Sequence, residues 1–243
     1  MNWRKLAGES IALFAIGCMS GAHLKPTPTE RTSLAQLKPA AGEPYVLLYG
    51  DSLTSQHCNF YPAMRKEFPR VSVVPAGIVG ASTWEMARSF APEKWTPPPD
   101  LVVLLMGVNN FAHDPYHQPE RGWADLEGMR QRALRARVPV LIGTPLPYGR
   151  WNPVTMNLCP TEWSNQYVAE LRRFILERSA PDIIDFDQAI PFDNPEQWLP
   201  DCLHPSSEGA ERMAWLVRAA VCERLWRPEF ARLCAASPTP AGQ

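Results

Sequence analysis

The stretch Tyr45–Thr54, which reads YVLLYGDSLT, indicates both the fold of this chain and the place of its candidate site. Its first five residues are apolar or β-prone, and they have the length and bounds of a buried strand. The strand stops at Gly50, and Asp51 and Ser52 follow as residues that bond to neighbouring backbone groups in turns. Open α/β sheets bind ligands beyond the carboxyl ends of their strands, which is where the Ser52 hydroxyl would lie. A serine hydroxyl there is a weak nucleophile until a base takes its proton, so the rest of the chain can be searched for that base.

Apolar runs alternate with helical patterns along the rest of the chain. The runs predict four more strands, at Val71–Ala76, Leu101–Met106, Val138–Gly143 and Asp182–Phe186. The helical patterns cover Phe60–Phe68, Thr83–Phe90, Trp123–Arg137, Glu162–Ser179 and Ser207–Trp226. Ser82 or Thr83 is expected to cap the second helix, and Thr161 the fourth. Because strands that alternate with helices form parallel sheets covered on both faces, we expect a single three-layer α/β/α domain with a central five-stranded parallel sheet.

Composition sets the size of the domain and excludes one class of partner. The chain has 243 residues, of which 45% are hydrophobic, and this is enough for one sizeable core. Its formal net charge of −1 leaves no basic footprint, so we expect no nucleic-acid partner. The expected organisation is a signal segment over residues 1–20, a proline-rich linker over 21–43, the folded domain over 44–234 and a disordered tail over 235–243.

The N-terminus has the pattern of an export signal. Arg4 and Lys5 supply a positive start, and Ile11–Ile16 forms an apolar core too short to span a bilayer as a helix. We therefore expect an extracytoplasmic protein; the alternative is a frayed N-terminal helix of a cytosolic one. The segment AIGC resembles a bacterial lipobox, although Ala15 replaces the usual leucine. Two outcomes stay open: Cys18 is lipidated and anchors the chain to a membrane, or the signal is cleaved without lipidation.

The cysteine count also bears on the compartment. If Cys18 is lipidated or removed, five cysteines remain, and an odd count in an oxidising compartment leaves at least one outside intramolecular pairs. Cys58, Cys159 and Cys202 fall in predicted loops on the same face of the sheet. A bridge among them is open, as is its pairing, and the spacing of the cysteines matches no zinc pattern.

A base and an acid for Ser52 occur together near the end of the chain. Asp201 and His204 stand three residues apart in DCLHP, so one turn could bring both to the same side. His204 would take the Ser52 proton through one ring nitrogen, while Asp201 would hold the other ring N–H and stabilise the imidazolium. Gly80 and Asn109 follow the second and third strands. The backbone N–H groups of Ser52 and Gly80 and the side-chain amide of Asn109 could together donate hydrogen bonds to an oxyanion.

These residues carry a family resemblance. The segments GDSL at 50–53, Gly80, GVN at 107–109 and DxxH at 201–204 resemble, in order, the four sequence blocks of the SGNH (GDSL) hydrolase superfamily. Each block alone is weak, but all four in order form a strong signal over about residues 45–226. The resemblance implies a flavodoxin-like fold and metal-free ester or thioester hydrolysis. It also implies Ser52 as nucleophile, Gly80 and Asn109 as oxyanion donors, and Asp201 with His204 as the remaining catalytic pair.

Two positions in these blocks allow more than one interpretation. The third block of the superfamily often reads GxND, whereas Asn110 follows Asn109 here, and we expect this to change loop hydrogen bonding more than chemistry. In the second block, Gly77 could serve in place of Gly80. Gly80 is preferred because the segment AGIVGAST resembles the pattern in which the later glycine faces the nucleophile.

Other residues near the site are candidates for metal or substrate binding. His113, Asp114 and His117 lack a third ligand at a suitable spacing, so we expect no metal and no cofactor. His57 is expected to line a cleft rather than act as a second base. Asp185 and Asp187 are expected to end a strand and cap a turn. The expected substrate contacts are Asp51, Trp151 and Trp198.

The sequence thus predicts an extracytoplasmic serine esterase, in the periplasm, anchored to a membrane as a lipoprotein, or secreted. Its substrate would be a small-molecule or carbohydrate ester, with short acyl groups such as O-acetyl on carbohydrate favoured. The alternatives are a lysophospholipase or thioesterase-like lipid hydrolase, an acyltransferase, and a catalytically silent envelope binding protein. A flavodoxin-like binder of a phosphorylated cofactor is disfavoured because no glycine-rich phosphate loop is present.

Overall fold

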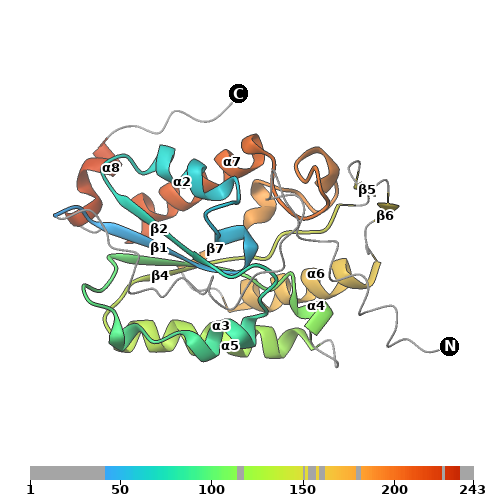
Figure 1. Ribbon diagram of the computed structural model, residues 1–243, viewed down its shortest axis with the longest axis horizontal. Coiled ribbons are helices and arrows are strands. Elements are labelled where there is room, and N and C mark those ends of the chain that lie inside the picture. The colour runs from blue at the N-terminus through green and yellow to red at the C-terminus, as the bar shows by residue number, and fades with distance from the viewer. Residues whose placement is uncertain are drawn as a thin grey trace.

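The computed structural model describes residues 42–113, 118–149, 151–152, 157–158, 162–178, 182–225 and 228–235. They form three layers, with a sheet between two sets of helices (Figure 1). The α/β/α sandwich expected from the sequence is therefore confirmed. The predicted signal segment and nearly all of the predicted linker and tail lie outside the described residues.

The central sheet has five parallel strands in the spatial order β2-β1-β3-β4-β7. Their bounds are Tyr45–Gly50 for β1, Ser72–Gly77 for β2, Leu101–Leu105 for β3, Val140–Gly143 for β4 and Ile183–Ile184 for β7. Each strand lies at one of the apolar runs that predicted it. Strands β1, β3 and β4 are buried along their whole length, as expected for parallel strands covered on both faces.

The strand order determines where a ligand can bind. The chain passes from β1 to β2 on one side and then returns to place β3 on the other side of β1. This is the flavodoxin-like order, which opens a crevice beyond the carboxyl ends of the two strands at the reversal. Ser52 follows β1 and Asn109 follows β3, so both candidate groups lie beyond the carboxyl ends of the two strands at the reversal.

Helices cover both faces of the sheet (Figure 1). One face carries α2 (Phe60–Glu67), α7 (Ser207–Ala220) and α8 (Ala231–Ala235), and α2 packs against α7. The other face carries α3 (Thr83–Ser89), α4 (Asn110–His113), α5 (Pro119–Arg135) and α6 (Glu162–Glu177), and α5 packs against both α3 and α6. The five predicted helices are all present.

The boundaries of helix α5 differ from the predicted ones at both ends. Helix α5 begins at Pro119 rather than Trp123, because proline is well suited to the first turn of a helix. It ends before Arg137, whose φ of 61° is left-handed. Ser82 caps α3 in a capping box with Glu85, which confirms one of the two caps proposed for that helix. Thr161 lies outside the described residues.

Some short elements were not predicted. The long loop after β4 contains a two-stranded antiparallel pair, β5 (Trp151–Asn152) and β6 (Asn157–Leu158). Helix α7 continues as a π-helical turn, Val221–Leu225, and Ala235 ends α8 rather than starting the predicted tail. Segments of two to five residues carry too little periodicity to be recognised in a sequence.

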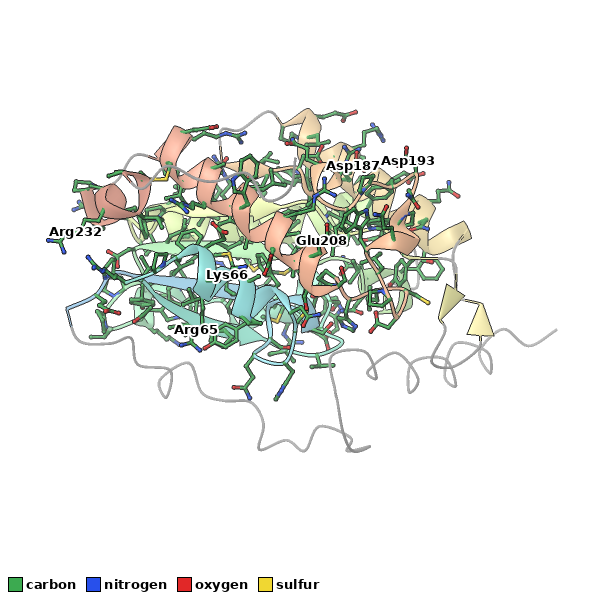
Figure 2. The ribbon with its side chains drawn as sticks, turned by 90° about the horizontal axis from the view of Figure 1, so that it is seen from above. Arg65, Lys66, Asp187, Asp193, Glu208 and Arg232 are labelled. Carbon is green, nitrogen blue, oxygen red and sulfur yellow. A yellow bond between two sulfur atoms is a disulfide. The ribbon has the colours of Figure 1, made fainter. Side chains whose placement is uncertain are left out.

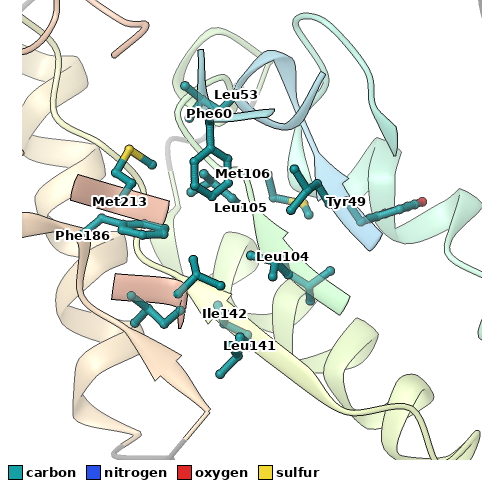
Figure 3. Packing of buried hydrophobic residues seen from close by; sticks show 14 of the residues in the cluster. Tyr49, Leu53, Phe60, Leu104, Leu105, Met106, Leu141, Ile142, Phe186 and Met213 are labelled. Atoms are coloured by element: carbon teal, nitrogen blue, oxygen red, sulfur yellow. The ribbon is translucent and has the colours of Figure 1, made fainter. Parts of the chain in front are cut away.

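The apolar core lies on both faces of the sheet. Figure 3 shows Leu53 and Phe60 near Leu105 and Met106, with Phe186 beside Met213 on α7. The Phe60 and Phe186 rings meet edge to face, with centroids 6.1 Å apart. Leu53 directly follows Ser52 and is fully buried, so the core holds the residue next to the candidate nucleophile.

Charged side chains cover the outside of the helical layers. Figure 2 shows Lys66 on α2 and Glu208 on α7, on the same outer surface. Lys66 also pairs with Glu211 of α7 at 2.7 Å, but both side chains are exposed, so the pair contributes little to stability. No helix in the described ranges is long and apolar enough to cross a membrane.

Two of the described cysteines close the C-terminal end of the fold. Cys222 and Cys234 form a disulfide that joins the π-helical turn to α8. Cys202 is also disulfide-bonded, whereas Cys58 is a buried thiol. Cys58 therefore takes no part in the bridge proposed among Cys58, Cys159 and Cys202. Cys159 lies outside the described residues, so its part in that bridge stays a prediction.

Gly77 is required at the end of β2 by close backbone approach. A Cβ at this position would lie 2.2 Å from the Asp51 carbonyl oxygen and 2.5 Å from the Ser55 nitrogen. Gly77→Ala should therefore lower the free energy of unfolding by about 2 to 4 kcal/mol, as measured by urea denaturation. Gly128→Ala is the matched control, because this exposed helical position has no atom within 4 Å of the added carbon. The control should be neutral or stabilising by up to about 1 kcal/mol, and equal effects of the two changes would contradict the explanation.

Candidate active site

Ser52 is held by a short turn at the end of β1. It begins the 3₁₀ turn η4 (Ser52–Thr54), whose N-cap is Asp51. The Asp51 Oδ1 atom accepts a hydrogen bond from the Leu53 N–H at 3.0 Å, and the Asp51 carbonyl accepts from the Thr54 N–H at 3.1 Å. With Leu53 anchored in the core, these bonds fix the backbone that carries the Ser52 hydroxyl.

The predicted base and acid lie next to that hydroxyl. Ser52 Oγ is 2.9 Å from His204 Nε2, and His204 Nδ1 is 2.7 Å from Asp201 Oδ2. Asp201 Oδ1 also accepts hydrogen bonds from the backbone N–H groups of Leu203 at 3.0 Å and His204 at 2.6 Å. The three residues predicted from sequence are thus in one hydrogen-bonded row, and all three are buried.

Asp201 and His204 shift each other's proton affinity. Burial by itself lowers the pKa of His204, but the hydrogen bond and charge of Asp201 outweigh it and raise the pKa above its usual value. Burial raises the pKa of Asp201, but the contacts with His204 and the two N–H groups outweigh it and lower the pKa. The Asp201 contribution to stability is therefore present above about pH 4 and lost as pH falls through its lowered pKa. The His204 contribution is full below about pH 6.5 and lost as pH rises through its raised pKa.

Asn109 and Asn110 have different surroundings at the end of β3. Asn109 is half-buried, and its Nδ2 donates one hydrogen bond to the Ala81 carbonyl at 3.2 Å, which leaves the amide a second N–H. Asn110 is buried; its Oδ1 accepts from the Thr83 N–H at 2.8 Å, and its Nδ2 lies 3.0 Å from the Tyr167 hydroxyl. The second asparagine therefore ties the loop to α3 and α6, in agreement with the expectation that it serves loop hydrogen bonding.

Gly77 and Gly80, the two candidates for the second block, are glycines for different structural reasons. Gly77 pairs with Gly50 in the sheet and leaves no room for a Cβ. Gly80 has a φ of 75°, which favours glycine, and has open space where a Cβ would be. Gly80 thus lies in the loop beyond the strand, while Gly77 belongs to the strand itself. The role of Gly80 as an oxyanion donor stays a prediction.

Two of the predicted substrate contacts are buried side chains. Asp51 has no exposed surface and caps the turn that carries Ser52. Trp198 is 8% exposed, and the Arg212 guanidinium lies over its ring, 4.5 Å from the ring centroid. Ser52 and His204 are buried to the same degree, so the roles of Asp51 and Trp198 as substrate contacts stay predictions. The side chain of Trp151 lies outside the described residues.

Other candidates lie away from the reacting atoms. His57 is exposed, and its Nε2 is 3.1 Å from Gln56 Nε2; its place in the wall of a cleft stays a prediction. Asp185 follows β7, caps the 3₁₀ turn η6 (Phe186–Gln188) and pairs with Arg172, as expected of a strand-end residue. Within the described ranges no group of His, Cys, Asp and Glu could hold a metal ion, and Asp114 and His117 lie outside them, as does the side chain of His113.

Sequence reasoning missed a support built around Tyr148. The Tyr148 hydroxyl donates to the Val108 carbonyl at 2.6 Å, directly before Asn109. Its backbone N–H and carbonyl bond to the Asn165 side chain of α6 at 2.6 and 2.9 Å, and burial raises its pKa. The next residue, Gly149, donates to the Cys202 carbonyl at 2.8 Å. This loop segment therefore connects the Asn109 loop to the His204 loop, and nothing in the local pattern TPLPYG signals such a contact.

Asp51 has the opposite environment to Asp201. Its Oδ2 has no hydrogen-bond partner of normal geometry among the described residues, and burial raises the pKa of this carboxyl to about 7. Between about pH 4 and pH 7 the unfolded chain releases this proton while the folded chain keeps it, so Asp51 makes stability fall as pH rises.

Replacing Asp51 by asparagine should remove that pH dependence. The amide keeps an acceptor oxygen for the Leu53 N–H but cannot ionise, so Asp51→Asn should flatten the decline by an amount on the order of a few kcal/mol. Urea denaturation between pH 4.5 and pH 8 measures the effect. The exposed Asp193→Asn is the matched control and should follow the wild-type curve. Parallel curves for Asp51→Asn and wild type would show that Asp51 is ionised throughout.

Comparison with known proteins agrees with this geometry. Residues 48–212, about two thirds of the chain, match the GDSL-like lipase/acylhydrolase family. The matched region begins within β1 and includes Ser52, Asn109, Asp201 and His204. A sequence comparison with curated proteins found no match.

Solved structures share the fold at low sequence identity. A GDSL-like lipase from Bacteroides thetaiotaomicron is 18% identical, with a TM-score of 0.59, over 90% of this chain and 97% of its own. A carbohydrate acetylesterase family member from Sinorhizobium meliloti is 19% identical, with a TM-score of 0.55, over 73% of this chain and 99% of its own. A catalytic mutant of an acetylxylan esterase from Geobacillus stearothermophilus is 17% identical, with a TM-score of 0.53, over 74% and 94%.

These structural likenesses concern the fold, whereas the family match rests on the sequence of most of the domain. The family match agrees with the resemblance of the four sequence blocks, and so do the hydrogen bonds that join Ser52, His204 and Asp201. The chain belongs to the GDSL-like lipase/acylhydrolase family and is an ester-bond hydrolase.

Proposed function

We propose that the protein is a serine esterase that hydrolyses a short acyl ester, with O-acetyl groups on carbohydrate as the favoured substrate class. The observation that carries the proposal is the continuous row of hydrogen bonds from Ser52 Oγ through the His204 ring to Asp201. Carbohydrate as the alcohol is supported by the acetylxylan esterase and carbohydrate acetylesterase among the structural neighbours.

Acylation begins with proton transfer from Ser52 to His204. As Ser52 Oγ bonds to the ester carbonyl carbon, His204 Nε2 takes the hydroxyl proton, and Asp201 stabilises the imidazolium that results. The negative charge on the carbonyl oxygen is met by the Ser52 and Gly80 backbone N–H groups and the Asn109 amide. When the C–O bond to the alcohol breaks, His204 gives its proton to the leaving oxygen.

Deacylation repeats these steps with water. His204 takes a proton from the water as its oxygen bonds to the acyl carbon, and then returns a proton to Ser52 Oγ when the acyl–serine bond breaks. A sugar hydroxyl in place of water would give acyl transfer from the same acyl-enzyme. Since His204 acts as a base only when neutral, and Asp201 raises its pKa, activity should fall below neutral pH.

A lipid ester is a second candidate substrate, favoured by apolar side chains beside the site. Ile78 and Val79, which are 43% and 40% exposed, precede Gly80 in the loop after β2, and Trp84, 44% exposed, follows it. The Ile78 N–H donates to the Gly50 carbonyl at 2.9 Å, so this loop is attached to the end of the strand that carries Ser52. Such a surface could accept a longer acyl chain.

An extracytoplasmic location is part of the proposal. It is supported by the disulfide between Cys222 and Cys234 and by the disulfide-bonded Cys202, since such bonds persist in oxidising compartments. The N-terminal signal pattern and Cys18 lie outside the described residues, so lipid anchoring through Cys18 rests on the sequence alone. Mass spectrometry of the mature N-terminus distinguishes a lipidated Cys18, a cleaved signal and an intact Met1.

Ser52→Ala should abolish esterase activity. Without the hydroxyl no acyl-enzyme can form, so p-nitrophenyl acetate hydrolysis should fall at least about 1,000-fold while the unfolding free energy stays near the wild-type value. His57→Ala is the control, because this exposed histidine lies close in sequence but does not contact Ser52. Activity retained in the Ser52 variant would rule out the proposed mechanism.

Asn109→Ala should slow turnover without unfolding the protein. Loss of one oxyanion donor should lower kcat about 100-fold or more and leave KM nearly unchanged. Asn110→Ala provides the contrast: its bonds to Thr83 and Tyr167 are structural, so this change should mainly lower the thermal unfolding temperature. Full activity in the Asn109 variant would refute its role as a donor.

Acyl-chain profiling separates the two candidate substrates. With p-nitrophenyl esters from acetate to palmitate, the carbohydrate-ester proposal expects kcat/KM to be highest for acetate and to fall with chain length. Release of acetate from acetylated polysaccharide would add direct support. A preference for chains of eight carbons or more would instead favour the lipid ester, and Ile78→Ser should then reduce that preference.

A further inference from the structure

The turn that carries the catalytic pair has an unusual residue at its centre. Cys202, between Asp201 and His204, has a φ of 77° and is 1% exposed. The left-handed region is rare for residues with a Cβ and is the usual place of glycine or asparagine. Cys202 therefore carries a side chain at a position where the backbone conformation favours glycine.

The hydrogen bonds of the turn converge on one carboxylate. The Asp201 side chain accepts the N–H groups of Leu203 and His204 on one oxygen and the His204 ring on the other. Cys202, with its left-handed backbone, is the residue that links Asp201 to these donors. The backbone at Cys202 therefore sets how Leu203 and His204 are placed relative to the Asp201 carboxylate.

Three bonds hold Cys202 in place. Its side chain is disulfide-bonded, its N–H donates to the Leu199 carbonyl at 3.1 Å, and its carbonyl accepts the Gly149 N–H at 2.8 Å. Gly149 follows Tyr148, whose backbone is bonded on both sides to the Asn165 side chain and whose hydroxyl is bonded to Val108. Gly149 also comes so close that a Cβ on it would lie 3.2 Å from the Cys202 Cα. The turn is thus attached to a segment that is itself fixed.

We propose that Cys202 is a positioning residue: its disulfide keeps the turn left-handed, so that Asp201 orients His204 toward Ser52. This inference rests on the proposed function of the three residues. Reduction of the bond would release the turn to the more common backbone conformations, weaken the contact between Asp201 and His204, and lower turnover. Activity would then depend on an oxidising environment.

Four variants test the proposal. Cys202→Ser and Cys202→Gly both remove the disulfide, but only glycine adopts the left-handed conformation without steric cost. Gly149→Ala keeps the disulfide and presses a methyl group toward the Cys202 Cα, so it still reports on the turn if the cysteine variants fail to fold. Cys222→Ser with Cys234→Ser is the matched control, because it removes a disulfide at the far C-terminal end of the fold.

Two readouts are measured for each full-length variant. The first is the pH dependence of kcat and KM for p-nitrophenyl acetate. The second is the pKa of the His204 imidazole by NMR, assigned by the loss of its signal in His204→Gln; it does not require activity. If wild type and all variants are inactive toward esters, the proposed function fails, while the NMR titration still decides the role of Cys202.

Cys202→Ser should lower kcat about 10-fold or more with KM within about 2-fold, because small misplacements of a catalytic group are costly. The pKa of His204 should be lower in this variant, because part of the interaction with Asp201 that raises it is lost. The acid limb of the pH–kcat profile should move to lower pH with it. Cys202→Gly should lie closer to wild type in both readouts, Gly149→Ala should shift both in the same direction as serine, and the control pair should change neither. An unchanged His204 pKa in Cys202→Ser, or equal effects of serine and glycine, would overturn the proposal.

Discussion

The ends of strands β1, β2 and β3 touch without side chains between them, and the positions of Ser52, Gly80 and Asn109 depend on this contact. A Cβ on Gly50 would lie 1.8 Å from the Leu105 carbonyl oxygen, and one on Gly77 would lie 2.2 Å from that of Asp51. Glycine at both positions lets the backbones meet. The turn that carries Ser52 rests on this junction, and the loops with Gly80 and Asn109 leave from its two sides.

The site combines two carboxyl groups in different environments. Asp201 receives three hydrogen bonds and stays ionised, so it can stabilise a positive His204. Asp51 receives one good hydrogen bond on a fully buried side chain, and its pKa rises to about 7. Below about pH 7 this carboxyl is neutral and supports the Ser52 turn without a second full negative charge beside the imidazole, and above that pH it ionises.

The large features were predictable because their signals are local or repeated. Five apolar runs and the helices between them are long enough to show their period, and GDSL, GVN and DxxH mark strand ends and a turn by residue type. The capping box at Ser82 and Glu85 is likewise written in four consecutive positions. Burial is not predictable in the same way, because the near-complete burial of Asp51 and Trp198 depends on contacts between distant parts of the chain. The same holds for Tyr148, whose partners lie 40 and 17 residues away in the chain.

The candidate nucleophile and its base are 152 residues apart in the sequence. The first strand and its turn are made early in synthesis, whereas Asp201 and His204 belong to one of the last loops, and α7, which follows them, packs on α2. Because a domain folds as a unit, a chain that ends before Asp201 carries Ser52 with no partner to activate it. The reactive centre therefore exists only when both ends of the domain are present and packed together.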